Sequence, residues 1–141
     1  MIKLIVSLFI VSIICSLNAK ETDAYIKEES IPIFHITHEN PSFEKINDRI
    51  IVNHYVLKVS NTNNQDTSYR FEIKNKDFSH SIKKDIFIGK NETKTIFFEV
   101  FIYSELTKKL RNIEKLEVVI SDKNNQAIKA IEQIDFIVKN K

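Results

Sequence analysis

The feature that most constrains this chain is a series of short runs in which every second residue is apolar. One run spans residues 55–59, and the next spans 69–73. Because a strand projects alternate side chains to opposite faces, each run predicts a β-strand that is buried on one face. Three later runs follow the same pattern, at residues 96–102, 116–120 and 134–138.

Two shorter segments, Ile33–Thr37 and Ile82–Ile88, bring the prediction to about seven strands. A strand of this kind offers only about three inward apolar residues, so a single sheet would leave a wide apolar face in water. Two stacked sheets bury both faces against each other. The sequence therefore predicts an all-β antiparallel sandwich over residues 31–141, with Leu57 and Phe71 in its core.

The connections between these runs are rich in Asn and Asp, whereas the whole chain holds one Gly. Asn and Asp tolerate positive φ best among the residues with a side chain, so we expect them to occupy the tight turns. One segment, Ser104–Lys115, has helical spacing instead, with Leu106, Leu110 and Ile113 on one side and Ser104 as a cap. It predicts a turn or two of helix between the sheets.

The first 19 residues have the pattern of an export signal. Lys3 is their only charge, and residues 4–17 form an apolar run. This run is shorter than the ~20 residues that a transmembrane helix needs, and it suits the apolar region of a signal peptide. We expect cleavage after Ala19, a tether at 20–30 and a periplasmic location. An uncleaved membrane anchor at residues 4–17, and lipid attachment at Cys15, are the alternatives.

The composition excludes several functional classes. The 141 residues suffice for one domain, and a net charge of +2 gives no reason to expect a nucleic-acid partner. A single Gly excludes both the dinucleotide fingerprint and the phosphate loop. No Cys follows Cys15 and no Met follows Met1, so the exported part lacks soft ligands for copper. We therefore expect no cofactor.

The histidines give weak signals for chemistry. They are His35, His38, His54 and His80. His35 and His38 lie three apart, which places them on opposite faces of a strand and disfavours a shared metal. His80 lies between Ser79 and Ser81, but neighbours in sequence do not by themselves form a nucleophile and base. We expect solvent-exposed or hydrogen-bonded histidines, with a metal site or an acyl-transfer site as alternatives.

The segment from His38 to Asn61 has a more specific pattern. It contains an Asn-Pro pair, an aromatic residue, a turn, an Arg, an Asn and a strand that begins with Tyr. The residues concerned are Asn40, Pro41, Phe43, Arg49, Asn53, Tyr55, Leu57, Lys58 and Asn61. This order resembles the start of the C-terminal immunoglobulin-like accessory domain of the FixG/CcoG family. Ile88–Lys94 is similar to the turn before that family's long strand, with Asn91 in place of Gly or Glu.

The resemblance covers about residues 36 to 138 and implies a periplasmic immunoglobulin-like sandwich. FixG/CcoG proteins are membrane polyferredoxins linked to maturation of cbb-type cytochrome c oxidase. This chain has neither their transmembrane helices nor the cysteines that hold iron-sulfur clusters, so the resemblance does not extend to redox chemistry. It implies the accessory domain alone, as a stand-alone exported domain, and a shared fold does not establish a shared function.

Two features of the predicted sandwich suit binding. Phe97 and Phe101 point outward on the long strand and form an apolar surface unless Ser104–Ile113 covers them. An open sheet edge is the second feature, since it can accept a strand from a partner. We therefore expect a non-enzymatic binding or assembly module whose partner is another periplasmic or membrane protein, with membrane contact only through an uncleaved leader. An envelope or surface protein of adhesin-like type is the alternative, and an enzyme is a third hypothesis.

Overall fold

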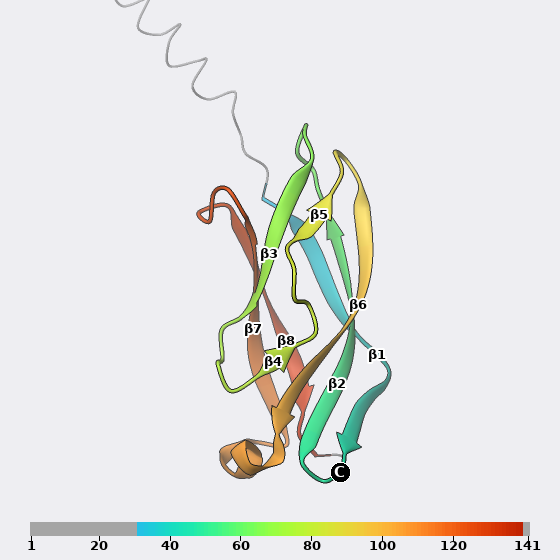
Figure 1. Cartoon of the computed structure of the whole chain (residues 1–141), viewed down its shortest axis with the longest axis vertical. Coiled ribbons are helices and arrows are strands. Elements are labelled where there is room, and N and C mark those ends of the chain that lie inside the picture. The colour runs from blue at the N-terminus through green and yellow to red at the C-terminus, as the bar shows by residue number, and fades with distance from the viewer. Residues whose placement is uncertain (1–30, 140–141) are drawn as a thin grey trace, which may run out of the picture.

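A computed structural model describes residues 31–139, and both the predicted leader (1–19) and the predicted tether (20–30) lie outside the described residues. The described part forms eight strands in two four-stranded antiparallel sheets that face each other (Figure 1). The predicted all-β sandwich is therefore confirmed. Within residues 31–139, no helix is long and apolar enough to cross a membrane.

The first sheet contains the longest strands and has the order β1-β2-β6-β4. Its strands span Ile33–Ile46 (β1), Ile50–Ser60 (β2), Thr93–Tyr103 (β6) and Ser79–His80 (β4). β2 pairs with β6 over the whole length of both strands. On its other side, β6 pairs with β4 only at Val100 and Phe101. Most of β6 therefore has a strand neighbour on one side alone.

The second sheet has the order β5-β3-β7-β8. Its strands span Ile86–Ile88 (β5), Thr67–Ile73 (β3), Ile113–Asp122 (β7) and Lys129–Ile137 (β8). A short 3-10 helix, η1 at Ser104–Lys109, connects β6 to β7 at one end of the sandwich (Figure 1). The two edges of this sheet are thus β5, which has only three residues, and β8, which has nine.

The core lies between the sheets and consists of the inward row of each strand. Leu57, which the sequence places at the centre, is fully buried, and Phe71 is 7% exposed. The predicted inward residues of β3, β7 and the C-terminal strand are buried as well. In β6 the same row is buried except at Ile96, which is half-buried. The period-two pattern therefore assigned the buried face of these strands correctly.

The predicted strand at Ile82–Ile88 is largely wrong. Only Ile86–Ile88 is a strand, and a further short strand, β4, precedes it at Ser79–His80. The reason is that the two strands belong to different sheets, since β4 pairs with β6 and β5 pairs with β3. Residues 82–85 must cross between the sheets, so they cannot continue either ladder.

The predicted helix at Ser104–Lys115 is shorter than expected. Six residues form η1, none of them is buried, and no side chain caps the helix. Ile113 belongs instead to β7, where its backbone is paired with Ile137 of β8. Strand pairing therefore overrides the helical spacing of Leu106, Leu110 and Ile113, as tertiary contacts commonly override a weak local preference.

Asn and Asp occupy the positive-φ turn positions, as the sequence predicts. Asn47 and Asp48 in the β1–β2 turn have φ of 52° and 54°, and Asn91 in the β5–β6 turn has 55°. Gly89 does not have positive φ. A Cβ atom there would lie 2.5 Å from the carboxylate of Glu92, so a larger residue at this position requires only that the Glu92 side chain move.

Side chains join the two sheets along the flank where β1 and β8 lie, which we call the β1/β8 flank. Asn53 projects inward from β2 and is fully buried. Its amide nitrogen donates to the Ile137 carbonyl oxygen at 2.9 Å, and its amide oxygen accepts from the Ile137 N–H at 2.8 Å. The hydroxyl of Tyr55 donates to the Asp135 carbonyl oxygen at 2.7 Å. These bonds occupy backbone groups at the outer edge of β8, where a further strand would otherwise pair.

Candidate functional site

Three aromatic side chains lie in a row on the outer face of β6. Phe97 is 67% exposed, Tyr103 is 52% exposed, and Phe101, which lies between them, is half-buried. They share one face because they are separated by even numbers of residues on one strand. The alternative that Ser104–Ile113 covers Phe97 does not hold, since η1 lies at the end of the sandwich and Phe97 remains exposed.

Apolar residues of β2 extend this row sideways. Val56 lies opposite Phe97, Val52 lies opposite Phe101, and Ile50 lies opposite Tyr103. Val52 is only 3% exposed although it belongs to the outer face of the sheet. Together these residues make up the outer apolar patch: Ile50, Val52, Val56, Phe97, Phe101 and Tyr103.

Sequence reasoning found the β6 half of the patch and missed the β2 half. Ile50 and Val52 precede the strand that the sequence predicts from Tyr55, whereas β2 begins at Ile50; Val56 lies within the predicted strand. A signal was present, because residues 50–52 and 55–57 are apolar at successive positions. Such runs indicate apolar side chains on both faces of a strand.

His54 interrupts the outer apolar patch with a charged row. Its Nδ1 lies 3.4 Å from Oε1 of Glu99 on β6, and its Nε2 lies 3.4 Å from Oε2 of Glu44 on β1. These three residues come from three neighbouring strands and lie side by side on the outer face. The row separates the Phe97 part of the patch from the Phe101 part and gives the face a polar stripe.

His80 does not form a nucleophile and base with its neighbouring serines. Its ring packs edge-on against Phe71 with the centroids 4.9 Å apart, and its buried Nδ1 has no hydrogen-bond partner among the described residues. Burial lowers the pKa of His80, and the charge of Lys83 lowers it further. The Ser81 hydroxyl instead accepts a hydrogen bond from the Glu99 N–H at 2.9 Å.

His35 and His38 lie on opposite faces of β1, as their spacing predicts. The Nδ1 of His35 is 3.2 Å from Oε1 of Glu132, and that same oxygen accepts the Ile36 N–H at 3.2 Å. The ring of His38 packs on Tyr55 instead, with the centroids 4.7 Å apart. Within residues 31–139, no group of three His, Cys, Asp or Glu side chains is arranged to hold a metal ion.

Three of the residues that carry the sequence resemblance, Asn53, Tyr55 and Asn61, have structural roles. Asn53 and Tyr55 join the sheets, and burial raises the pKa of Tyr55, with the charge of Asp135 adding to the effect. Asn61 fixes the turn after β2, since its amide nitrogen donates to the Ile88 carbonyl at 3.1 Å and its amide oxygen accepts from the Tyr69 hydroxyl at 3.0 Å. These contacts position turns and the core, and they bring no reactive groups together.

A family model described as "IG-like fold at C-terminal of FixG, putative oxidoreductase" matches residues 29–139. The chain belongs to this family. The FixG C-terminal family assignment confirms the resemblance predicted from the sequence, and with it the immunoglobulin-like form of the sandwich. None of the curated proteins matches the chain.

A solved structure agrees with the fold of this FixG C-terminal domain. The crystal structure of a FixG-related protein from Vibrio parahaemolyticus is similar at a TM-score of 0.67 and 20% identity, covering 79% of this chain and 99% of that one. At this identity the likeness concerns the fold alone. A second crystal structure, of a protein from Archaeoglobus fulgidus, gives a TM-score of 0.39 at 10% identity, also covering 79% of this chain and 99% of that one.

Proposed function

We propose that this domain is a non-enzymatic binding or assembly module that docks another protein through the outer apolar patch. The observation that supports the proposal most strongly is Phe97, which is 67% exposed beside Val56 on the outer face of the sheet. Exposed apolar surface of this kind commonly marks a partner site, and aromatic side chains dominate the energetics of such sites.

We further infer that the module works outside the cytoplasm in a FixG-like system associated with maturation of cbb-type cytochrome c oxidase. The export-signal pattern at residues 1–19 supports the compartment, and membership of the FixG C-terminal family supports the system. The partner is then another periplasmic or membrane protein that presents an apolar surface to the patch.

Deletion of the gene tests the link to the oxidase. We expect reduced oxidase activity and reduced assembly of the enzyme under copper limitation, restored by the wild-type gene. Unchanged assembly under these conditions would contradict the respiratory part of the proposal. Cell fractionation tests the compartment, since recovery in the soluble periplasm agrees with the proposal. Recovery in the outer membrane or the medium favours an envelope or surface structural protein instead.

Complementation with paired surface variants tests the patch itself. Phe97→Ser removes the most exposed aromatic side chain of the patch, and we expect it to abolish rescue of the deletion. Ile131→Ser is the matched control, because Ile131 is 52% exposed and lies on β8 of the other sheet. Equal rescue by the two variants, at equal protein levels, would show that the outer apolar patch is not the docking surface.

A further inference from the structure

We propose that one edge of β6 accepts an acidic, extended segment of the partner as an additional strand. The inference rests on the proposed function and specifies the chemistry of its partner. The edge concerned is the side of Thr93–Phe97 that faces away from β2, and we call it the β6 edge. In the described part of the chain no strand pairs with it, because β4 reaches only Val100 and Phe101.

The backbone of the β6 edge is oriented for pairing. The Glu99 carbonyl oxygen accepts the Ser81 N–H at 3.0 Å, and the Glu99 N–H donates to the Ser81 hydroxyl at 2.9 Å, so both groups point away from β2. Because this orientation repeats every second residue in a strand, the N–H and C=O groups of Thr95 and Phe97 point the same way. The bonds between Ser81 and Glu99 are the last ones that the β4 segment makes with β6. Toward Thr93, the next residue whose N–H and C=O point away from β2 is Phe97, and the β6 edge begins there.

Apolar side chains border the β6 edge on both of its sides. Ile96 and Ile82 are half-buried and pack against the core on the inner side. Phe97 lies on the outer side and is exposed. A strand added here would place alternate side chains over Ile96 and beside Phe97. The partner segment should therefore carry apolar residues at alternating positions, as strand-adding peptides do.

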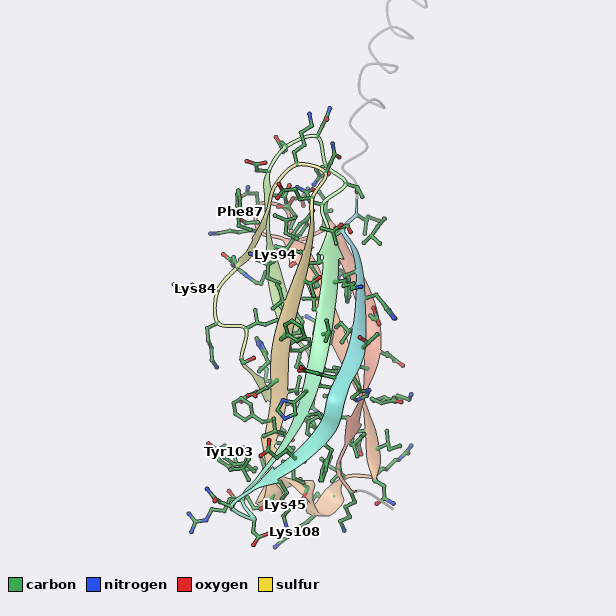
Figure 2. All side chains as sticks on the ribbon, turned by 90° about the vertical axis from the view of Figure 1, so that its right-hand side faces the viewer. Lys45, Lys84, Phe87, Lys94, Tyr103 and Lys108 are labelled. Carbon is green, nitrogen blue, oxygen red and sulfur yellow. The ribbon has the colours of Figure 1, made fainter. Side chains whose placement is uncertain are left out.

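Lysines surround the β6 edge and set the charge that its partner should have. Lys83 and Lys84 lie in the crossing between β4 and β5, and Lys94 lies on β6 itself; all three are exposed. Figure 2 shows Lys84, Lys94 and Phe87 on the same flank of the sandwich. The Lys94 ammonium donates to the Phe87 carbonyl oxygen at 3.4 Å. Across residues 31–139, no carboxylate forms an ion pair with any of these three lysines.

The acidic residues described near the edge form no ion pair with its three lysines. Asp85 lies 3.0 Å from the Lys123 ammonium and 4.0 Å from Arg70, both on the side of the second sheet. The Glu92 carboxylate lies against Gly89 in the β5–β6 turn. Lys83, Lys84 and Lys94 are therefore available to pair with carboxylates of a docked strand.

Charge also argues against a second copy of this chain as the occupant. Pairing two β6 edges about a twofold axis would bring two sets of the same three lysines together, and like charges across a strand pair are destabilising. An acidic segment meets the same backbone groups and the same apolar side chains with attraction instead of repulsion.

A synthetic acidic peptide, Ac-EVTVEITVE-NH2, tests the inference with the purified protein, and isothermal titration calorimetry measures its affinity. The control peptide, Ac-KVTVKITVK-NH2, has the same apolar pattern and the opposite charge. We expect the acidic peptide to bind, the basic peptide to bind at least about tenfold more weakly, and added salt to weaken the acidic complex. Equal binding of the two peptides, or failure of the acidic peptide to bind, would overturn the inference.

Paired charge-reversal variants locate the site. Replacement of Lys83, Lys84 and Lys94 by Glu should weaken binding of the acidic peptide by about tenfold or more. The matched control replaces Lys45, Lys108 and Lys109 by Glu, three exposed lysines at the far end of the sandwich, two of which Figure 2 labels. Equal weakening by the two triple variants would indicate long-range attraction only, and that result counts against the β6 edge.

A separate measurement tests whether the peptide pairs with the backbone of the β6 edge. In NMR spectra, the acidic peptide should shift and protect from exchange the amide protons of Thr95 and Phe97 more than those of β8. Thr95→Pro removes one of these N–H groups while leaving pairing with β2 in place, and it should abolish binding. If that variant does not fold, the amide shifts alone decide. Peptide binding without protection at Thr95 and Phe97 would exclude strand addition.

The outcomes separate this inference from the proposed function. Loss of rescue with Phe97→Ser but full rescue with the Lys83/Lys84/Lys94 reversal would refute the acidic strand and retain the binding module. Equal rescue by the Phe97→Ser and Ile131→Ser variants refutes the proposed function. A dimer of the purified protein that is broken by Thr95→Pro would identify a second copy as the occupant and overturn the choice of an acidic partner.

Discussion

The two flanks of this sandwich differ in which backbone groups at their strand edges have hydrogen-bond partners. On the β1/β8 flank, side chains from inside the sandwich occupy backbone groups at the strand edges, as Asn53 does for Ile137 and Glu132 does for Ile36. On the β6 flank, only the short β4 and Ser81 cover the lower part of β6. On the β1/β8 flank, these edge backbone groups are hydrogen-bonded to side chains. On the β6 flank, no strand of the described residues pairs with the edge at Thr93–Phe97.

This difference shows that protection of an edge is local. β1 has an irregular register between His38 and Phe43, and β8 carries the inward-pointing charge of Glu132. Irregular pairing and inward charges both discourage strand addition. The edge of β6 keeps a regular register with β2 between Thr93 and Phe97, and the charge in its inward row is Lys94, whose ammonium donates to the Phe87 carbonyl oxygen of the other sheet. Its exposed lysines oppose a strand of like charge and favour one of opposite charge.

The largest expected effect comes from opening the β1/β8 flank at Asn53. Asn53→Ala leaves both the N–H and the C=O of Ile137 without their partners near a fully buried position. We expect the free energy of unfolding to fall by about 2 to 4 kcal/mol, since each such group costs about 1 to 3 kcal/mol when buried and Ile137 is only half-buried. Urea denaturation followed by circular dichroism measures it. Asn64→Ala, at an exposed position in the loop between β2 and β3, is the matched control and should change little.

A smaller loss should follow from Tyr55→Phe on the same flank. The variant keeps the buried ring and removes the hydroxyl that donates to the Asp135 carbonyl. We expect a loss of about 1 to 2 kcal/mol in the free energy of unfolding. Tyr103→Phe is the matched control because Tyr103 is exposed on the outer face of β6, and equal losses in the two variants would argue against the role of the buried hydroxyl.

Acidification should lower the free energy of unfolding through His80, which lies on β4, the short strand that pairs with β6. Burial lowers the pKa of His80 below the value of about 6.5 that it has in the unfolded chain. Between these two pKa values the unfolded chain binds more protons, so the free energy of unfolding falls as the pH drops through that window. Denaturation curves at several pH values should show this slope, and His80→Gln should reduce it. An unchanged slope would mean that other groups dominate.

The smallest effect on stability should come from the β6 flank itself. Phe97→Ala removes a side chain that is mostly exposed, so we expect a change within about 0.5 kcal/mol in the free energy of unfolding. Thermal and urea denaturation measure it. A loss comparable to that of Asn53→Ala would show that Phe97 supports the fold and would weaken its assignment to binding.

The period-two pattern of the sequence was enough to predict the strands whose side chains alternate between buried and exposed. It also placed Phe97 and Phe101 on the outer face of β6 correctly. It could not predict the crossing at 82–85, because that depends on β4 and β5 belonging to different sheets. It could not show the partner of Asn53 either, since Ile137 lies 84 residues away. The availability of the β6 edge is likewise non-local. It follows from which strands lie beside β6, and period-two patterns do not contain that information.

The Asn53 and Tyr55 bonds link the two layers with neutral, non-covalent contacts, and no cysteine is present between residues 31 and 139. Reducing agents therefore have no bond to break in this domain. Its folded state should persist unchanged when thiols are abundant in its surroundings.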